Sequence, residues 1–279
     1  MAETKPLIDI IKDHMASGEI KLPVLSQSAA QLQKEVTKED PDMGKVENYI
    51  KMDPAITGEV LKVANSSYYK GIGTVDTIKE ASLRIGVNEL ANIVIMVLHR
   101  ENFKSNDPFI NNYLKQLWRH SLASAVGSHW LAKYLSLDQI QGKAFIGGML
   151  HDMGKLFLIT AVEDIKKIDK EFNPSTFLLD KMISGLHPNQ GYTLLHKWNL
   201  PENYCIIARD HHEMEFDTGN MLLTIVRLVN RLCNKMGIGP SCEEHKAIAG
   251  SIEVDLLDLS EIAIAELEIK IEDSIGRFS

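Results

Sequence analysis

Cysteine is scarce in this chain, and the cysteines present follow no pairing pattern. The 279 residues contain three of them, Cys205, Cys233 and Cys242, with no CxxC spacing. An odd number of cysteines without such a spacing predicts no disulfide framework. This usage is typical of a protein of the reducing cytoplasm, and we expect that location.

Positive charge and long apolar runs are also in short supply. The net charge is −8 and the pI is near 5.7, so no basic field is available to attract DNA or an anionic membrane. The first residues, MAETKPLIDIIKDHM, lack the apolar core of a signal peptide, and no stretch reaches 18 uninterrupted apolar residues. We therefore expect a soluble, cytoplasmic protein that binds neither DNA nor a membrane.

Strand signals are missing as well. The sequence shows no sustained apolar–polar alternation, no G-x-G-x-x-G motif and no P-loop, whereas helical spacing of apolar residues recurs throughout. The composition, 44% hydrophobic and 24% charged, is ordinary for a globular protein with a real core. We predict an all-α fold.

The polar segment 101–108 is the best internal boundary. It separates an N-terminal helical lobe (1–105) from a second helical lobe (106–236). An acidic helical extension follows (237–279), which we expect to complete the core or to form a homodimer surface.

Helices of the second lobe can be placed from their apolar spacing. Residues 109–135 are apolar on all sides and predict one long buried helix, and 145–159 predict another that packs near Gly127. Further helices are predicted over 165–172, over 175–184, from Pro188 onward, and over 222–233.

The stretch 145–159 carries His151, Asp152 and Lys155 inside an apolar run. Adjacent residues on a helix differ by about 100° in direction, so the imidazole of His151 and the carboxylate of Asp152 can bind one ion. Lys155 follows one turn later and can hold a phosphate or pair with Asp152. Because burying three polar groups without partners is costly, either other segments supply partners or the helix is half exposed and the motif is coincidental.

Ten histidines are spread over the chain, and five of them can complete a site around Asp152. These five are His120, His151, His187, His211 and His212. They lie on or beside separate predicted helices, as in the metal sites of helical bundles. Imidazole suits zinc, iron, nickel or copper, and a carboxylate can bridge two ions. The alternative for any one histidine is a hydrogen-bonded core residue, which is our interpretation of His14, His99, His129, His196 and His245.

One set of motifs occurs in a familiar order: His120, His151-Asp152 with Met153-Gly154-Lys155, His187, and His211-His212-Glu213. This order resembles the HD superfamily of metal-dependent phosphohydrolases, and most closely its HD-GYP branch, which hydrolyses cyclic di-GMP. A second set comprises Leu22-Pro23, Asp53-Pro54-Ala55, Ala64-Asn65-Ser66, Ala81-Ser82-Leu83 with Ile85-Gly86, and Trp118-Arg119-His120-Ser121. This set is similar to an HDOD domain, the HD-related output domain of bacterial signalling proteins, over about residues 18–236.

The resemblance implies an HD-domain-like helical bundle with a metal site. The implied metal ligands are His120, His151, Asp152, His187, His211 and His212, and the implied catalytic residues are Asp152 and Lys155. The implied cofactor is one or two divalent transition-metal ions (Fe, Mn, Zn or Ni). A nucleotide ligand and a protein partner in a bacterial signalling pathway are implied as well.

Two ligand positions depart from the HD patterns. The HD pattern ends in a metal-binding aspartate where this chain has Asn230, and the HD-GYP pattern has a glutamate one turn before the first histidine where it has Gln116. The Gly-Tyr-Pro loop is replaced by residues 214–220. An amide offers a carbonyl oxygen but no negative charge. With Asp152 as the sole carboxylate, one weakly held ion is favoured over a tight two-ion centre.

Two functions remain open on these residues. The first is a bacterial regulatory HDOD protein whose weakened site is structural or ligand-sensing and whose output runs through a protein partner, as Gln116 and Asn230 favour. The second is a metal-dependent phosphohydrolase acting on a nucleotide or cyclic dinucleotide. Arg119, Lys155 and Arg209 could gather its phosphate, the alternative being solvated or salt-bridged charge.

Overall fold

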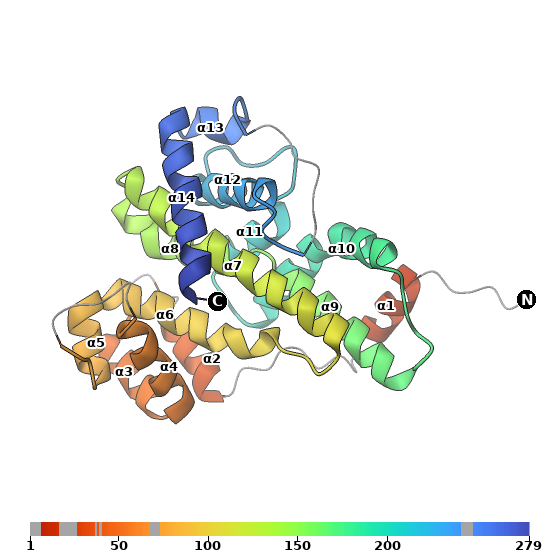
Figure 1. The fold of residues 1–279 in the computed structure, drawn as a ribbon, viewed down its shortest axis with the longest axis horizontal. Helices are drawn as coiled ribbons and strands as arrows, with labels where there is room; N and C mark the ends of the chain where they lie inside the picture. The colour runs from red at the N-terminus through yellow and green to blue at the C-terminus, as the bar shows by residue number, and fades with distance from the viewer. Residues whose placement is uncertain are drawn as a thin grey trace, which may run out of the picture.

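The structure, a computed structural model, describes residues 7–16, 27–36, 38, 41–66, 73–240 and 248–278. Within these ranges all regular secondary structure is helical, and no strand occurs (Figure 1). The prediction of an all-α fold is confirmed.

The N-terminal part is a group of short helices. They are α1 (Leu7–Ala16), α2 (Gln27–Val36), α3 (Met43–Lys51), α4 (Pro54–Ala64), α5 (Ile78–Ile85) and α6 (Val87–Arg100). Side-chain caps define their starts: Asp42 accepts a hydrogen bond from the Lys45 amide, and Thr77 and Glu80 form a reciprocal capping box. Helix α1 packs against α9 and α10, across the molecule from α3 to α5 (Figure 1).

The second part is built around α7. Its elements are η1 (Glu101–Phe103), α7 (Pro108–Tyr134), η2 (Asp138–Ile140), α8 (Gln141–Leu150), α9 (Met153–Ile168), α10 (Thr176–Lys197), α11 (Glu202–Asp210), α12 (Met221–Lys235), α13 (Ile252–Leu256) and α14 (Glu261–Phe278). Helix α7 contacts α8, α12 and α14 and is buried on several sides, as its apolar circumference predicts. Asp107 caps its first turn ahead of Pro108.

The predicted helix over 145–159 is wrong in one respect that matters for the site. Helix α8 ends at Leu150 and α9 begins at Met153, so His151 and Asp152 form a turn between two helices. The apolar spacing continues across the turn because both helices are core helices, which conceals the break from a periodicity argument. This bend places the two side chains at a helix junction rather than along one helical face.

Two further boundaries differ from expectation. Residues 175–184 and the segment from Pro188 form one helix, α10, with Pro188 in its interior. Pro188 cannot donate a helical hydrogen bond, a loss that costs about 3 kcal/mol. The packing of α10 against α9 and α11 outweighs that local preference. Helix α9 ends at Ile168, short of the expected 172.

Glycine permits the close approach of α8 to α7, at a different position from the one predicted. A Cβ on Gly148 would lie 2.5 Å from the Ser124 carbonyl oxygen, so α8 crosses α7 backbone to backbone there. Gly127 instead faces the side chains of Val229 on α12 and Ile271 on α14. The 145–159 segment thus packs on α7 as expected, but the role expected of Gly127 is wrong, because residues of α12 and α14 fill the space beside it.

Helix α6 joins the two parts through a buried, partly polar face. Glu89 pairs with His129 at 2.8 Å, and its charge and hydrogen bond raise the pKa of His129 although burial acts to lower it. His99 is fully buried and stacks on Trp198 at 5.7 Å, and burial lowers its pKa to about 4. Within the described residues neither ring nitrogen of His99 has a hydrogen-bond partner, so its expected role as a hydrogen-bonded core residue is only half right.

One stretch, Asp138–Ile168, is long and apolar enough to cross a membrane by length and composition alone. It is interrupted at the His151–Asp152 turn, and 94% of its most apolar window is buried inside the protein. Such burial is typical of a core helix. Cys205 and Cys233 are buried free thiols, and Cys242, His245 and Leu22-Pro23 lie outside the described residues.

Candidate metal centre

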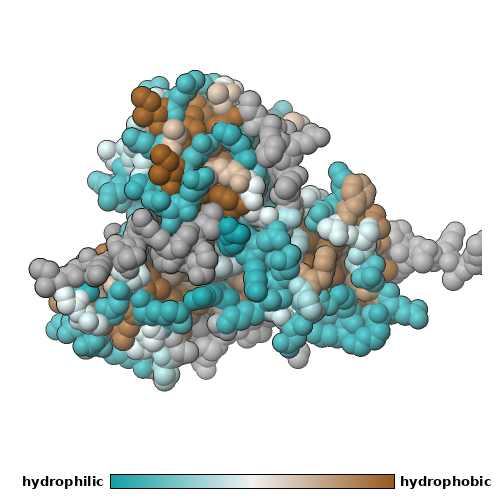
Figure 2. Space-filling view, viewed as in Figure 1, coloured by the Kyte–Doolittle hydropathy of each residue, from teal (hydrophilic) through white to brown (hydrophobic). Residues whose placement is uncertain are grey.

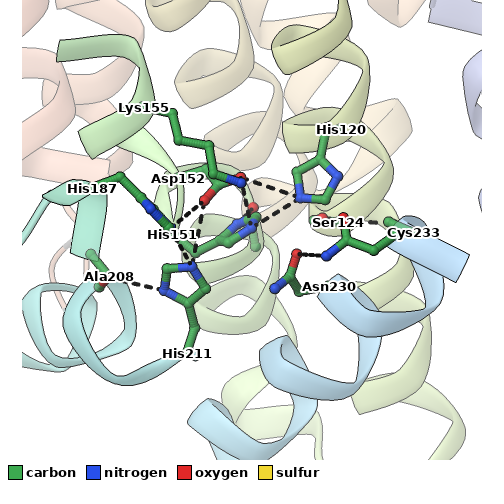
Figure 3. A network of polar contacts seen from close by, with 12 residues as sticks. His120, Ser124, His151, Asp152, Lys155, His187, Ala208, His211, Asn230 and Cys233 are labelled. Atoms are coloured by element: carbon green, nitrogen blue, oxygen red, sulfur yellow. Dashed lines mark hydrogen bonds and ion pairs between the residues drawn. The ribbon is translucent and has the colours of Figure 1, made fainter. Parts of the chain in front are cut away.

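Four histidine side chains converge on the carboxylate of Asp152 in two groups (Figure 3). In the first group, His120 Nε2 lies 3.2 Å from His151 Nε2, and the two lie 3.3 and 3.5 Å from Asp152 Oδ2. In the second, His187 Nε2 lies 3.3 Å from His211 Nε2, and the two lie 3.5 and 3.4 Å from Asp152 Oδ1. Each carboxylate oxygen thus faces its own pair of imidazoles.

These ligands come from separate elements, as expected for a bundle-core site. His120 lies on α7, His187 on α10 and His211 directly after α11, while His151 and Asp152 form the α8–α9 turn. Close packing of α9 on α10 brings Asp152 and His187 together, because Gly154 approaches the backbone of α10 at His187.

Main-chain carbonyls fix the orientation of each imidazole. The Nδ1 atoms of His120, His151, His187 and His211 lie 2.7, 2.8, 2.9 and 3.0 Å from the carbonyl oxygens of Ile238, Gly148, Ile183 and Ala208. A carbonyl only accepts hydrogen bonds, so we assign the ring proton to Nδ1 in each case. The Nε2 lone pairs then all point at Asp152, and this is how metal-ligating histidines are commonly held.

Burial sets the charge state of the centre. Burial lowers the pKa of His120 to about 4 and the pKa values of His187 and His211 to about 3. For Asp152 burial acts to raise the pKa, but the nearby Lys155 and His151 hold that pKa well below its usual range. At neutral pH His120, His187 and His211 are therefore neutral and Asp152 is ionised, the forms that bind metal.

The two groups fit a metal ion on their own geometry. Nε2 lone pairs that face each other at 3.2 and 3.3 Å repel unless a cation lies between them. Two ligands each about 2.1 Å from one ion are roughly 3.0–3.4 Å apart, which matches the observed spacings. Within the described residues, both oxygens of Asp152 are buried without a hydrogen-bond partner, and the ion pair of Oδ2 with Lys155 Nζ at 2.9 Å leaves Oδ1 facing the imidazoles of His187 and His211. His120, His151 and Asp152 could hold one ion, and His187, His211, His212 and Asp152 another.

The other predicted residues occupy different places. His212 is half-buried in the second group, and Lys155 lies with its Nζ 2.9 Å from Asp152 Oδ2, so it pairs with that carboxylate. Asn230 is buried beside the histidines and accepts a hydrogen bond from Asn234 (Figure 3). Gln116 is half-buried one turn before His120.

The two arginines predicted to bind phosphate have other surroundings. Arg119 is exposed on α7. Arg209 binds both oxygens of Asp210 and stacks on Tyr192 at 5.2 Å, so its charge is already satisfied by a neighbour. For Arg209 the salt-bridged alternative holds.

Sequence reasoning did not find the carbonyl groups that orient the histidines. The Ile238 carbonyl lies in the turn after α12, where Gly237 and Gly239 have φ values of 68° and 145°. A Cβ on Gly239 would lie 3.2 Å from His120 Nδ1. The Gly-x-Gly spacing could have marked a tight turn, but nothing in it pointed to His120.

Acidification should destabilise the metal-free protein. His120, His187 and His211 have folded pKa values below 6.5, so the unfolded chain takes up their protons first as the pH falls. Asp152 acts in the same sense at lower pH, and His129 opposes with a raised pKa. We expect the free energy of unfolding to fall by roughly 1 kcal/mol per lowered histidine for each pH unit below about 6. Urea titrations of metal-free protein at pH 7, 6 and 5 test this, and an unchanged or rising stability would contradict it.

The comparison with protein families settles the relationship. A family model described as the HDOD domain matches residues 22–214. The chain belongs to the HDOD family. The match confirms the resemblance seen in the sequence, and it ends before α12, so the last three helices lie outside it.

Relatives and solved structures agree with this HDOD assignment. An uncharacterized protein of Treponema pallidum (strain Nichols) is 26% identical over 198 residues, which cover 69% of this chain and 38% of that protein. The chain thus spans well under half the length of this relative. An HDOD domain protein of unknown function from Geobacter sulfurreducens superposes with a TM-score of 0.74 at 18% identity, covering 96% of each chain. A Shewanella amazonensis SB2B protein, provisionally named a metal-dependent phosphohydrolase, gives 0.69 at 18% identity over 96% of this chain and 98% of that one. At these identities the two structures establish the shared fold.

Proposed function

We propose that this HDOD protein is a regulatory module built around a closed divalent-metal centre, and that it acts by binding a protein partner. One observation supports the proposal: His120, His151, His187 and His211 converge on Asp152, and all five side chains are sealed from solvent. His151 is 0%, Asp152 1% and His211 3% exposed, and the Lys155 beside them is 4% exposed. A catalytic metal site keeps an open position for water and substrate, whereas a structural site is closed.

The surface offers apolar area for such a partner. Figure 2 shows apolar side chains gathered over α13 and α14. The exposed large hydrophobic residues there are Ile252, Leu256, Ile262 and Ile269. Exposed apolar patches of this kind are typical of protein contacts. A second copy of the chain is one candidate for the partner, and the dependence of molecular mass on concentration in solution would reveal it.

A second function is supported by a different observation. Each oxygen of Asp152 faces its own pair of histidines, the arrangement expected of a carboxylate that bridges two ions. Ions bound there would supply Lewis-acid activation of water and of a phosphate ester. In that function Asp152 and the histidines hold the ions, and Lys155 would orient a phosphate. The substrate would be a nucleotide or cyclic dinucleotide.

Elemental analysis of the purified protein, followed by a phosphodiesterase assay with added Mn²⁺ or Fe²⁺, separates the two functions. We expect at least one transition-metal ion per chain and no turnover of cyclic di-GMP. Turnover that His151→Ala abolishes and His196→Ala retains would replace the regulatory proposal by the hydrolase. His196 is a suitable control because it is exposed on α10, so its interpretation as a core residue is wrong. A protein that binds no metal would overturn both.

A further inference from the structure

The C-terminal segment contributes a buried carboxylate that binds two arginines of α12. Glu253, on α13, is 0% exposed. Its Oε1 accepts a hydrogen bond from Arg227 Nε at 3.1 Å, and its Oε2 accepts one from Arg231 Nη1 at 2.8 Å. Both arginines belong to α12, so Glu253 ties α13 to that helix. A buried carboxylate needs such partners, because an uncompensated charge in the interior is costly.

Arg227 also holds the segment that carries two of the proposed ligands. Its Nη1 donates to the carbonyl oxygen of Asp210 at 2.8 Å, and its guanidinium lies 3.9 Å from the centre of the Phe216 ring. The same Asp210 carbonyl accepts the Glu213 amide at 3.1 Å, which closes the turn. One side chain therefore contacts this turn on both sides of His211 and His212.

We propose that Arg227 is a positioning residue for His211 and His212, and that Glu253 holds Arg227 in place. The C-terminal segment, outside the HDOD match, would thereby set the geometry of the second ligand group. The planar guanidinium suits this role, because one face stacks on a ring while its edge donates to a carboxylate and a carbonyl at fixed angles. The metal-binding half of this inference rests on the proposed function.

The test compares Arg227→Lys with Arg231→Lys in the full chain. Lysine keeps the positive charge near Glu253, but it cannot reproduce the fork of contacts to Asp210 and Phe216. Two quantities are measured: Co²⁺ affinity, and amide hydrogen exchange over residues 211–216 in metal-free protein. We expect Arg227→Lys to weaken Co²⁺ binding by about 10- to 100-fold, as loss of an outer-shell partner does, and to speed exchange over this segment. Arg231→Lys should change both far less.

The outcomes separate this inference from the metal proposal. Equal effects of the two substitutions would show a general structural role and overturn the positioning role. If the unmodified chain binds no Co²⁺, the proposed function fails, and hydrogen exchange alone decides whether Arg227 holds the turn. Should Arg227→Lys fail to fold, Glu253→Gln takes its place, with faster exchange over 211–216 expected and unchanged exchange as the contrary result.

Discussion

Replacing Asp152 with asparagine is expected to weaken Co²⁺ or Mn²⁺ binding by more than about 100-fold. The carboxylate faces both histidine groups and is the sole acidic residue in either of them. Loss of an outer-shell partner alone costs about 10- to 100-fold in metal affinity, so loss of a shared charged ligand should cost more. The substitution leaves the neutral imidazoles with no negative charge to balance an ion. Isothermal titration of metal-free protein measures the change.

Asp164→Asn is the matched control for this substitution. Asp164 pairs with Lys167 at 3.0 Å on the surface of α9, away from the histidines, and the same chemical change there should leave metal affinity unaltered. If Asp152→Asn retained the affinity of the unmodified chain, the histidine groups would not form an ion site around this carboxylate, and the proposed function would fall with it.

Gly154→Ala should produce the largest loss of stability of any single methyl addition in the second part of the chain. The added Cβ would overlap the carbonyl oxygen of His187 and would lie 2.7 Å from the Gly191 amide nitrogen, both on the backbone of α10. Backbone cannot move aside as a flexible side chain can, so we expect a cost of about 3 kcal/mol or more. Chemical denaturation monitored by circular dichroism measures it.

Gly185→Ala, on the partner helix α10, supplies the control. A Cβ at Gly185 meets nothing within 4 Å, and alanine in a helix interior is favoured over glycine by about 0.5–1 kcal/mol. The two substitutions should therefore act in opposite directions. A Gly154→Ala protein as stable as the unmodified chain would show that α9 and α10 do not need this close approach.

Local signals predicted the fold better than the site. Apolar spacing located α7 within a residue at each end, because a long helix buried on several sides leaves a strong pattern. The same pattern ran through the turn at His151 and concealed it. Pro188 predicted a break in the helix, but the packing of α10 against α9 and α11 overrides that local preference.

The site was predictable only as far as residue type allows. The order of the histidines in the sequence predicted which side chains meet at Asp152. It did not predict the orientation of each imidazole, which depends on hydrogen bonds to main-chain carbonyls. The carbonyl that orients His120 lies 118 residues away in the chain, at Ile238. Likewise, nothing in the acidic extension 237–279 distinguishes Glu253, whose burial depends on two arginines of another helix.

The placement of the ligands on separate helices has a consequence for how the protein unfolds. His120 and His151 are 31 residues apart in sequence, and His187 and His211 are 24 apart. An ion bound to such a set is a reversible cross-link that closes several chain loops at once, and loops of this length carry a sizeable entropy cost in the unfolded state. Loaded with metal, α7 to α11 would lose their structure together in one cooperative step. Removal of the ion would free each helix to open separately, so metal supply could control the lifetime of the folded chain as well as its output.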